Sequence, residues 1–393
     1  MKPIHVNPQI FSLIAVSLLA HVTMSGGRVT AALYALQHGG SEILAGVAYS
    51  LYNLLPVFLS LACGRWIDRV GPRRVMRWSL AMMVAGLALP AAWDSIYAVF
   101  GTAILSGLGF SNYMLAAHVA VGLMPFERET DRVGMFGWLQ MGNSISAVVG
   151  PSITGAMIDL SGFRAAFGML AAIVMASLIC AFRVNLPDGR RAQAAVAGGA
   201  NNLIATVLRD PRLMRVYLVA MTISLSWDGF VFMAPVLGHA RGYSATEVGM
   251  VLSAFACGTF SVRALLPWLS RVMSEWRMLA VAFGMSAVVF LALPFVHLGW
   301  LHALMGFVFG LAAGAGHPNT VNLIYRYVPR EQVGEGVGLR SMTGNLTGLF
   351  GPSLFGAISA LFGVVPVFLL VGGVMGASSW QARVGGRLAA AMR

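Results

Sequence analysis

Two charged residues lie inside long apolar stretches of the sequence: Arg28 in the first stretch, and Asp228 within Trp227-Asp228-Gly229-Phe230. A charge at the centre of a membrane helix costs about 2.5–3.5 kcal/mol on insertion scales, so we expect both to face a water-filled cavity and not lipid. A carboxylate there can bind and release a proton, and a neighbouring arginine changes how readily it does so. The hypothesis is that Arg28 and Asp228 approach one another and that Asp228 binds a proton or a cationic group of a substrate. The alternative is a static structural pair or an interfacial charge.

Other polar side chains within the apolar stretches are candidates for the same cavity. Histidine titrates near neutral pH and can relay protons. Of His21, His118 and His317, the best candidate is His317, because the following proline opens its helix, although each is more simply interpreted as a hydrogen-bonded core residue. Arg263 is interpreted as a charge that snorkels to the membrane face. The remaining candidates for the cavity wall are polar or aromatic: Tyr52, Asn53, Asn112, Tyr113, Gln140, Asn143, Trp227, Asn319 and Asn322.

The sequence carries no pattern typical of an enzyme. It has no Gly-rich phosphate loop ending in Gly-Lys-Ser/Thr, no His-Glu-x-x-His pattern and no Ser-Lys constellation at a membrane face. Cys63, Cys180 and Cys257 lie far apart without metal-ligand spacing, and the 23 methionines are scattered as apolar filler. We therefore expect a protein that is not an enzyme and holds neither metal nor cofactor.

The elements that carry these residues must be membrane helices. Hydrophobic residues make up 58% of the 393 residues and charged residues 10%, against about 25% charged in soluble domains. The mean hydropathy is +0.77. A soluble chain could not bury that much apolar surface, so lipid must surround most of it. The net charge of +12 is spread over short loops, which indicates membrane orientation and not nucleic-acid binding.

About twelve apolar runs are long enough to cross a bilayer. They are residues 10–33, 43–65, 75–92, 96–123, 134–159, 163–183, 213–237, 245–268, 277–295, 298–325, 336–360 and 363–382. We expect an all-α membrane protein with twelve transmembrane helices in two six-helix bundles, residues 1–183 and 213–393, joined by a cytoplasmic linker at 184–212. With the N-terminus inside, only Arg164 and Arg241 fall in outer loops, so both termini are predicted to be cytoplasmic.

An internal repeat indicates that the two halves are related. Gly150-Pro151-Ser152 recurs as Gly351-Pro352-Ser353, and the stretch 66–70 recurs, degenerate, as 268–272, at offsets of 201 and 202. Parallel halves related by an axis along the membrane normal are one way in which transporters are built. Subtracting this offset from 228 makes Asp228 equivalent to residues 25–27 of the first half, within a helical turn of Arg28.

The stretch from Gly64 to Arg74 places a cluster of arginines between two apolar runs. Such charge cannot lie in hydrocarbon, so we expect a tight loop at a membrane face, with Gly71-Pro72 as its turn. The stretch resembles the signature between the second and third helices of the major facilitator superfamily. The residues that match are Gly64, Asp68, Arg69, Gly71, Arg73 and Arg74. Ile67 replaces the usual small residue, and Pro72 is inserted before the arginine pair.

The resemblance implies a gate. In that family, the aspartate at the end of the second helix is thought to lock the inner side by facing the N-terminus of the eleventh helix, which carries about half a positive charge. For this chain it implies that Asp68 faces the start of the eleventh span, near residues 335–340. The alternative is a solvated charge cluster that only sets topology.

Small residues recur every four positions in the fifth and eleventh spans. The two stripes are Gly142, Ser146, Gly150 and Thr154, and Gly344, Gly348, Pro352 and Gly356. Such stripes let membrane helices approach closely. The first resembles the antiporter signature of the same superfamily through Gly150-Pro151, although the doubled glycine expected near its end is Gly155-Ala156. The second copy, Gly351-Pro352, fits symmetrical packing alone.

The resemblance as a whole implies a bacterial inner-membrane transporter that acts as a monomer. Substrate binds near the midplane between the halves, which rock to expose it to each side in turn. We expect proton-coupled antiport that exports small organic molecules, with a proton gradient as the energy source and with the substrate, protons and the lipid bilayer as partners. The first alternative is a proton symporter or facilitator for uptake of a metabolite, and the second is a membrane sensor or scaffold that does not transport.

Overall fold

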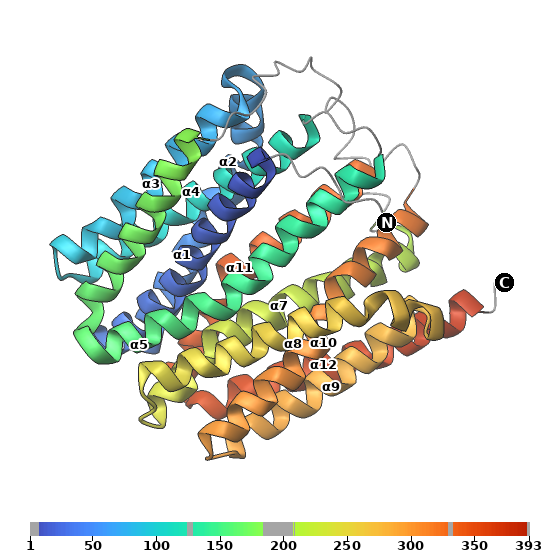
Figure 1. Ribbon diagram of the computed structural model, residues 1–393. Helices are drawn as coiled ribbons and strands as arrows, with labels where there is room; N and C mark the ends of the chain where they lie inside the picture. The colour runs from blue at the N-terminus through green and yellow to red at the C-terminus, as the bar shows by residue number, and fades with distance from the viewer. Residues whose placement is uncertain (1–7, 124–128, 184–206, 208, 329–332, 391–393) are drawn as a thin grey trace.

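The computed structural model describes residues 8–123, 129–183, 207, 209–328 and 333–390 (Figure 1). Within these residues, every regular element is a helix. The elements are α1 (Pro8–Gly39), α2 (Glu42–Val70), α3 (Pro72–Ala92), α4 (Ile96–Leu123), α5 (Glu129–Arg183), α7 (Pro211–Ala240), α8 (Ala245–Val272), α9 (Glu275–Ala292), the 3₁₀ helix η1 (Leu293–Phe295), α10 (Gly299–Tyr327), α11 (Val333–Phe362) and α12 (Val364–Ala390).

Helix α5 contains two membrane spans. Gly162 has a φ of 81°, a left-handed conformation that glycine tolerates, and it interrupts the 55-residue helix. The two parts correspond to the predicted spans 134–159 and 163–183. Among the described residues, 11 helices are long and apolar enough to cross a membrane. Because one of these is the interrupted α5, the chain has the twelve spans that were predicted.

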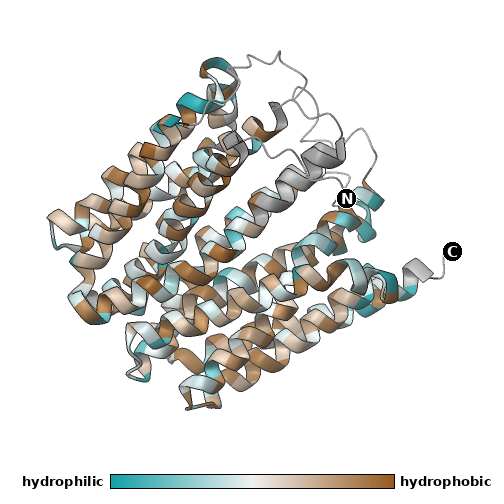
Figure 2. Ribbon diagram, viewed as in Figure 1, coloured by the Kyte–Doolittle hydropathy of each residue, from teal (hydrophilic) through white to brown (hydrophobic). Residues whose placement is uncertain are grey.

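The helices form two bundles, α1 to α5 and α7 to α12, seen in Figure 1 as a blue-to-green half and a yellow-to-red half. The bundles meet where α2 lies along α11 and where α5 lies along α8. We call these two lines of contact the seam. Figure 2 shows brown along the helix lengths and teal gathered near helix ends, as lipid-facing spans require. The predicted linker falls almost wholly outside the described residues, so the domain boundaries stay a prediction.

The prediction of a loop over residues 64–74 is wrong about the length of the loop. Helix α2 continues to Val70 and α3 begins at Pro72, so Gly71 alone is non-helical, with a φ of 87°. Proline suits the first position of a helix because the N–H that it lacks would have no partner there. The helices therefore carry the charged residues beyond the apolar run, and only the turn at Gly71-Pro72 lies where it was predicted.

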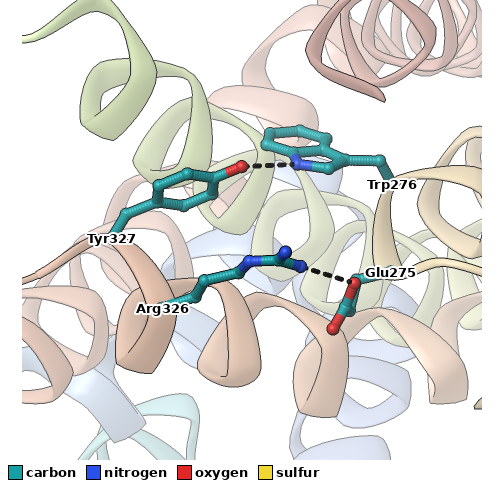
Figure 3. Close-up of polar contacts among 4 residues, drawn as sticks. All are labelled: Glu275, Trp276, Arg326 and Tyr327. Atoms are coloured by element: carbon teal, nitrogen blue, oxygen red, sulfur yellow. Dashed lines mark hydrogen bonds and ion pairs between the residues drawn. The ribbon is translucent and has the colours of Figure 1, made fainter. Parts of the chain in front are cut away.

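The two ends of the molecule differ in charge. We call the end where α2 finishes and α11 begins the arginine-rich end, and the opposite end the arginine-poor end. At the arginine-rich end, Arg326 Nη1 lies 3.6 Å from Glu275 Oε2, and Trp276 Nε1 donates to the Tyr327 hydroxyl at 3.3 Å (Figure 3). These contacts join the start of α9 to the end of α10.

Candidate functional site

The bundles touch closely where α2 meets α11. A Cβ atom added to Gly46 of α2 would lie 2.5 Å from the Pro352 carbonyl oxygen of α11, so only glycine fits there. The Ser50 and Ser353 hydroxyl oxygens are 2.9 Å apart, and the Ser353 backbone N–H donates to Ser50 Oγ at 3.2 Å. This contact lies in the half of each helix that belongs to the arginine-poor end.

The other contact, between α5 and α8, repeats this arrangement. A Cβ atom added to Gly249 of α8 would lie 2.5 Å from the Pro151 carbonyl oxygen of α5. The Ser152 and Ser253 hydroxyl oxygens are 2.7 Å apart. The recurring Gly-Pro-Ser segments therefore supply equivalent contacts on both lines of the seam, which is a physical reason for the repeat that requires no role in antiport.

The glycines before these prolines pack within their own bundles. A side chain at Gly150 would meet Ser25 of α1 and the Val22 backbone. A Cβ atom at Gly351 would lie 3.2 Å from Leu225 of α7. In each Gly-Pro pair, the glycine therefore packs within its own bundle, and the proline carbonyl contacts the other bundle.

Asp159 adds a charged contact at the arginine-poor end. It lies just before the Gly162 break in α5 and accepts hydrogen bonds from the backbone N–H groups of Ala245 at 3.0 Å and Thr246 at 2.7 Å. These are the first residues of α8, whose next N–H donates to Ser244 Oγ at 3.2 Å. A carboxylate at a helix N-terminus satisfies donors that have no partner within the helix and is favoured by the helix dipole.

Asp159 is a functional candidate that was not predicted, because it is the last residue of the predicted span 134–159. A usable signal was present. Ser244 and Glu247 have the spacing of a capping box, which marks a helix N-terminus, and Asp159 is a carboxylate at the same arginine-poor end.

A cavity of about 250 Å³ lies between the bundles. Its charged lining residues are Arg28 from α1 and Arg263 from α8, so each bundle contributes one. The rings of Trp227 and Phe255 also line it and pack edge to face with their centroids 4.8 Å apart. His21 lines the same space. We call this space the arginine cavity.

A second cavity, of about 270 Å³, lies beside it and shares Trp227 as a lining residue. Asp228 lines this space together with His317 and Arg340. The His317 ring meets Trp227 edge to face at 5.5 Å, and His317 Nδ1 lies 3.3 Å from Arg340 Nη1. We call this space the aspartate cavity.

The structure brings Arg28 and Asp228 to one point of the seam without a direct ion pair. Arg28 Nη2 donates to Asn53 Oδ1 at 3.1 Å, and Asn53 Nδ2 donates to the Gly348 carbonyl oxygen at 3.1 Å. A Cβ atom at Gly348 would lie 3.1 Å from Asp228 Oδ2, so the carboxylate faces α11 at this same glycine. Asn53 and Gly348 therefore bridge the two charges, and the Arg28 charge acts on Asp228.

Aromatic rings support the arginine. The Arg28 guanidinium carbon lies 5.2 Å from the centre of the Tyr49 ring and 5.7 Å from that of Tyr52, distances at which cation–π attraction acts. Both tyrosines are buried. Asn143 lines the arginine cavity. Three of the predicted wall residues, Tyr52, Asn53 and Asn143, thus lie at or beside the cavity.

Tyr52 and Asn53 contact Arg28 without lining either cavity, and four further predicted wall residues also line neither. Tyr113 is buried and its hydroxyl lies 2.7 Å from Ser17 Oγ, inside the N-terminal bundle, where Asn112 is also buried. Asn319 donates to the Ala315 carbonyl of its own helix at 2.8 Å. Asn322 is an exposed residue of α10. The Gln140 side chain lies outside the described residues.

The predicted gate at Asp68 stays a prediction, because the Asp68 side chain lies outside the described residues. Nearby, Arg69 and Arg74 are exposed, while Arg73 is partly buried. Among the described residues, no atom lies within 4 Å of a Cβ atom added to Gly64, in contrast to the tight contact at Gly46.

Metal binding has no candidate site among the described side chains, where no three His, Cys, Asp or Glu residues form a group that could hold an ion.

The family model described as Major Facilitator Superfamily matches residues 13–310 and 297–384. Among curated proteins, the inner membrane transport protein YajR of Escherichia coli (strain K12) is 26% identical over 351 residues, which cover 87% of this chain and 74% of that protein. The multidrug resistance protein MdtG of Salmonella choleraesuis (strain SC-B67) is 25% identical, with 86% and 84% covered. The multi-drug resistance efflux pump PmrA of Streptococcus pneumoniae serotype 4 is 23% identical, with 82% and 81% covered.

Solved structures share the fold at low sequence identity. A peptide transporter POT in complex with sulfate superposes with a TM-score of 0.82 at 13% identity, covering 98% of this chain and 95% of that chain. A mutant of the nucleoside transporter NupG gives a TM-score of 0.79 at 14% identity, covering 96% of this chain and 99% of that chain.

Proposed function

The chain belongs to the major facilitator superfamily, and from this premise we propose that it exports small organic molecules across the bacterial inner membrane in exchange for protons. Substrate would bind in the cavities between the bundles, which expose it to each side in turn. The names of the relatives MdtG and PmrA support export. Since both sides of the site come from one chain, we propose that the monomer is sufficient.

The position of Asp228 carries this proposal. Among the described residues that line the two cavities, it is the one carboxylate. Its surroundings include Arg28 and Asn53 of the N-terminal bundle and Gly348 of the other. When the bundles move, the electric field at a titratable group changes if its neighbours belong to both bundles. Binding a proton there can therefore bias one arrangement over the other.

The described arrangement is closed at the arginine-poor end. Among the described side chains, the hydrogen bonds between the bundles involve residues 144–159 of α5 and 50–53 of α2, which belong to the middle and the arginine-poor end of these helices. Arginine-rich ends lie in the cytoplasm by the positive-inside rule. We therefore propose that this arrangement faces inward and that an exported substrate would enter from it.

Proton flux in everted membrane vesicles tests the proposal. The vesicles are energised so that the lumen is acidic, and a panel of cationic, neutral and anionic aromatic compounds is added while a pH-sensitive dye is monitored. Antiport predicts that a substrate releases protons from the lumen, and that Asp228→Asn abolishes this release. Asp210→Asn is the matched control, because Asp210 caps the start of α7 through the Arg212 N–H at 2.8 Å and lines neither cavity.

Two results would contradict the proposal. Unchanged substrate-induced proton release by Asp228→Asn would remove the proton role of this residue. If no compound moves protons or crosses the membrane while the protein is correctly inserted, the sensor or scaffold alternative is favoured.

Uptake by proton symport is the second candidate, and the excess of arginine around Asp228 favours it. An anion bound to Arg28 would neutralise the positive charge beside Asp228. Asp228 would then bind a proton more readily, so the anion and the proton would bind together and not compete. In the same vesicles, symport predicts proton movement in the direction of the substrate.

A further inference from the structure

We propose that the arginine cavity binds an organic anion with a flat aromatic part, and that its anionic group lies between Arg28 and Arg263. The inference rests on the proposed function only in taking this cavity as the substrate site. It concerns the charge of the substrate, which neither the family nor the names of the relatives assign.

The arginines at the cavities are hydrogen-bonded to neutral groups. Arg28 donates to the Asn53 side-chain carbonyl, and Arg263 Nη1 donates to Ser144 Oγ at 3.1 Å. Arg340 Nη1 contacts the His317 ring. Within the described part of the chain, none of the three has a carboxylate oxygen within 4.0 Å, whereas Arg326 at the surface has Glu275 (Figure 3).

Some donors of these arginines have no acceptor at all. Arg28 Nε and Arg340 Nε are buried and make no hydrogen bond with any described group. A guanidinium offers five N–H donors in a fixed plane, and a buried charge without a partner is costly. These groups are therefore suited to a ligand that brings negative charge and acceptor oxygens.

The positive charges converge. Arg28 and Arg263 line the arginine cavity together, and Arg340 lines the aspartate cavity beside His317. Among the described lining residues of both cavities, Asp228 is the one carboxylate that faces these three arginines. The described residues that line the two cavities thus carry a net positive charge, which would repel a cationic substrate.

The remaining lining defines the rest of the ligand. Phe110, Trp227 and Phe255 contribute aromatic rings to the arginine cavity. Its volume of about 250 Å³ is near the lower end of ligand pockets, which begin at about 300 Å³. A small aromatic carboxylate would place its oxygens on the arginines and its ring against these side chains. Because Arg28 and Arg263 belong to different bundles, one anion would bind both bundles at once.

Binding of three probes of similar shape and different charge tests the inference. The full chain in lipid nanodiscs is titrated calorimetrically with 1-naphthoate, 1-naphthamide and 1-naphthylmethylammonium. We expect 1-naphthoate to bind at least about tenfold more tightly than either other probe, and Arg28→Gln and Arg263→Gln each to weaken it at least about tenfold, as the loss of a charge-assisted contact implies. Arg326→Gln, the control, leaves its affinity unchanged.

Lysine variants separate charge from folding. Arg28→Lys and Arg263→Lys keep the positive charge and are expected to retain part of the 1-naphthoate affinity that the glutamine variants lose. Equal affinity for the three probes, preference for 1-naphthylmethylammonium, or glutamine variants that bind 1-naphthoate as the parent does would each overturn the inference.

The outcomes distinguish this inference from the proposed function. Proton-coupled transport of 1-naphthylmethylammonium alone would support the transporter and overturn the anion site. Tight, arginine-dependent binding of 1-naphthoate without transport of any compound would support the anion site and contradict the transporter.

Discussion

Replacing Asp159 by asparagine should loosen the arginine-poor end of the seam. The carboxylate belongs to α5 in one bundle, yet it accepts the N–H groups of Ala245 and Thr246 at the start of α8 in the other. Opening this end separates the two helices and breaks both hydrogen bonds. Asparagine keeps one acceptor oxygen and loses the negative charge, so the closed arrangement is stabilised less while the open one is unaffected.

The magnitude follows from the geometry of a helix cap. Losing the negative charge of a carboxylate at a helix N-terminus costs about 1 kcal/mol, within a range of about 0.3–2. Asp159 is exposed, so water competes for the same donors and the middle of this range is appropriate. A loss of about 1 kcal/mol raises the ratio of open to closed molecules about fivefold.

Single-molecule energy transfer measures this ratio. Dyes are attached through unnatural amino acids at Tyr97 and Trp300, which are 71% and 67% exposed and begin helices of opposite bundles at the arginine-poor end. Asp159→Asn should spend about five times as long at low transfer efficiency as the parent. Glu247→Gln is the control, because Glu247 caps the same helix from within the same bundle through the Ser244 N–H at 2.9 Å. Equal dwell times in the parent and Asp159→Asn, or equal shifts in both variants, would refute the reasoning.

Three further predictions follow from the seam and its ends. Gly46→Leu, whose added side chain would collide with the Pro352 carbonyl, should increase low-efficiency dwells in the same experiment, and a parent-like distribution would show that the contact does not close the seam. Asp68→Asn should reduce transport while surface labelling finds the normal amount of protein in the membrane; full transport would remove the gate role. Arg326→Gln should lower the unfolding free energy in denaturant titration by less than about 1 kcal/mol, because its ion pair is solvent-exposed, and a larger loss would contradict this.

The fold could be predicted because the apolar runs have the length that a bilayer imposes. Residues 28 and 228 could be expected near each other for two reasons. A repeat offset of about 200 residues makes them nearly equivalent positions of α1 and α7, and the family resemblance implies that these two helices face each other across the cavity. The extent of the turn at Gly71 could not be predicted from charge alone, because a helix can continue into water once its backbone groups are paired.

The contents of the cavities were harder to predict. Asn319 lies on the same helix as His317, but its amide turns back to Ala315, and only the helix rotation decides this. Arg263 was assigned to the membrane face, whereas its side chain reaches Ser144 of the other bundle. Asn53 was a candidate without a partner, and its position between Arg28 and Gly348 depends on how α2 crosses α11.

A cross-link across the closed contact tests most directly whether the bundles move about the seam. The Ser50 and Ser353 oxygens are 2.9 Å apart, so cysteines at these positions are placed to form a disulfide. With the dyes at positions 97 and 300, alternating access predicts excursions to low transfer efficiency that disappear in the oxidised protein and return after reduction. A single constant efficiency in the reduced protein, or excursions that persist in the fully cross-linked protein, would contradict the account.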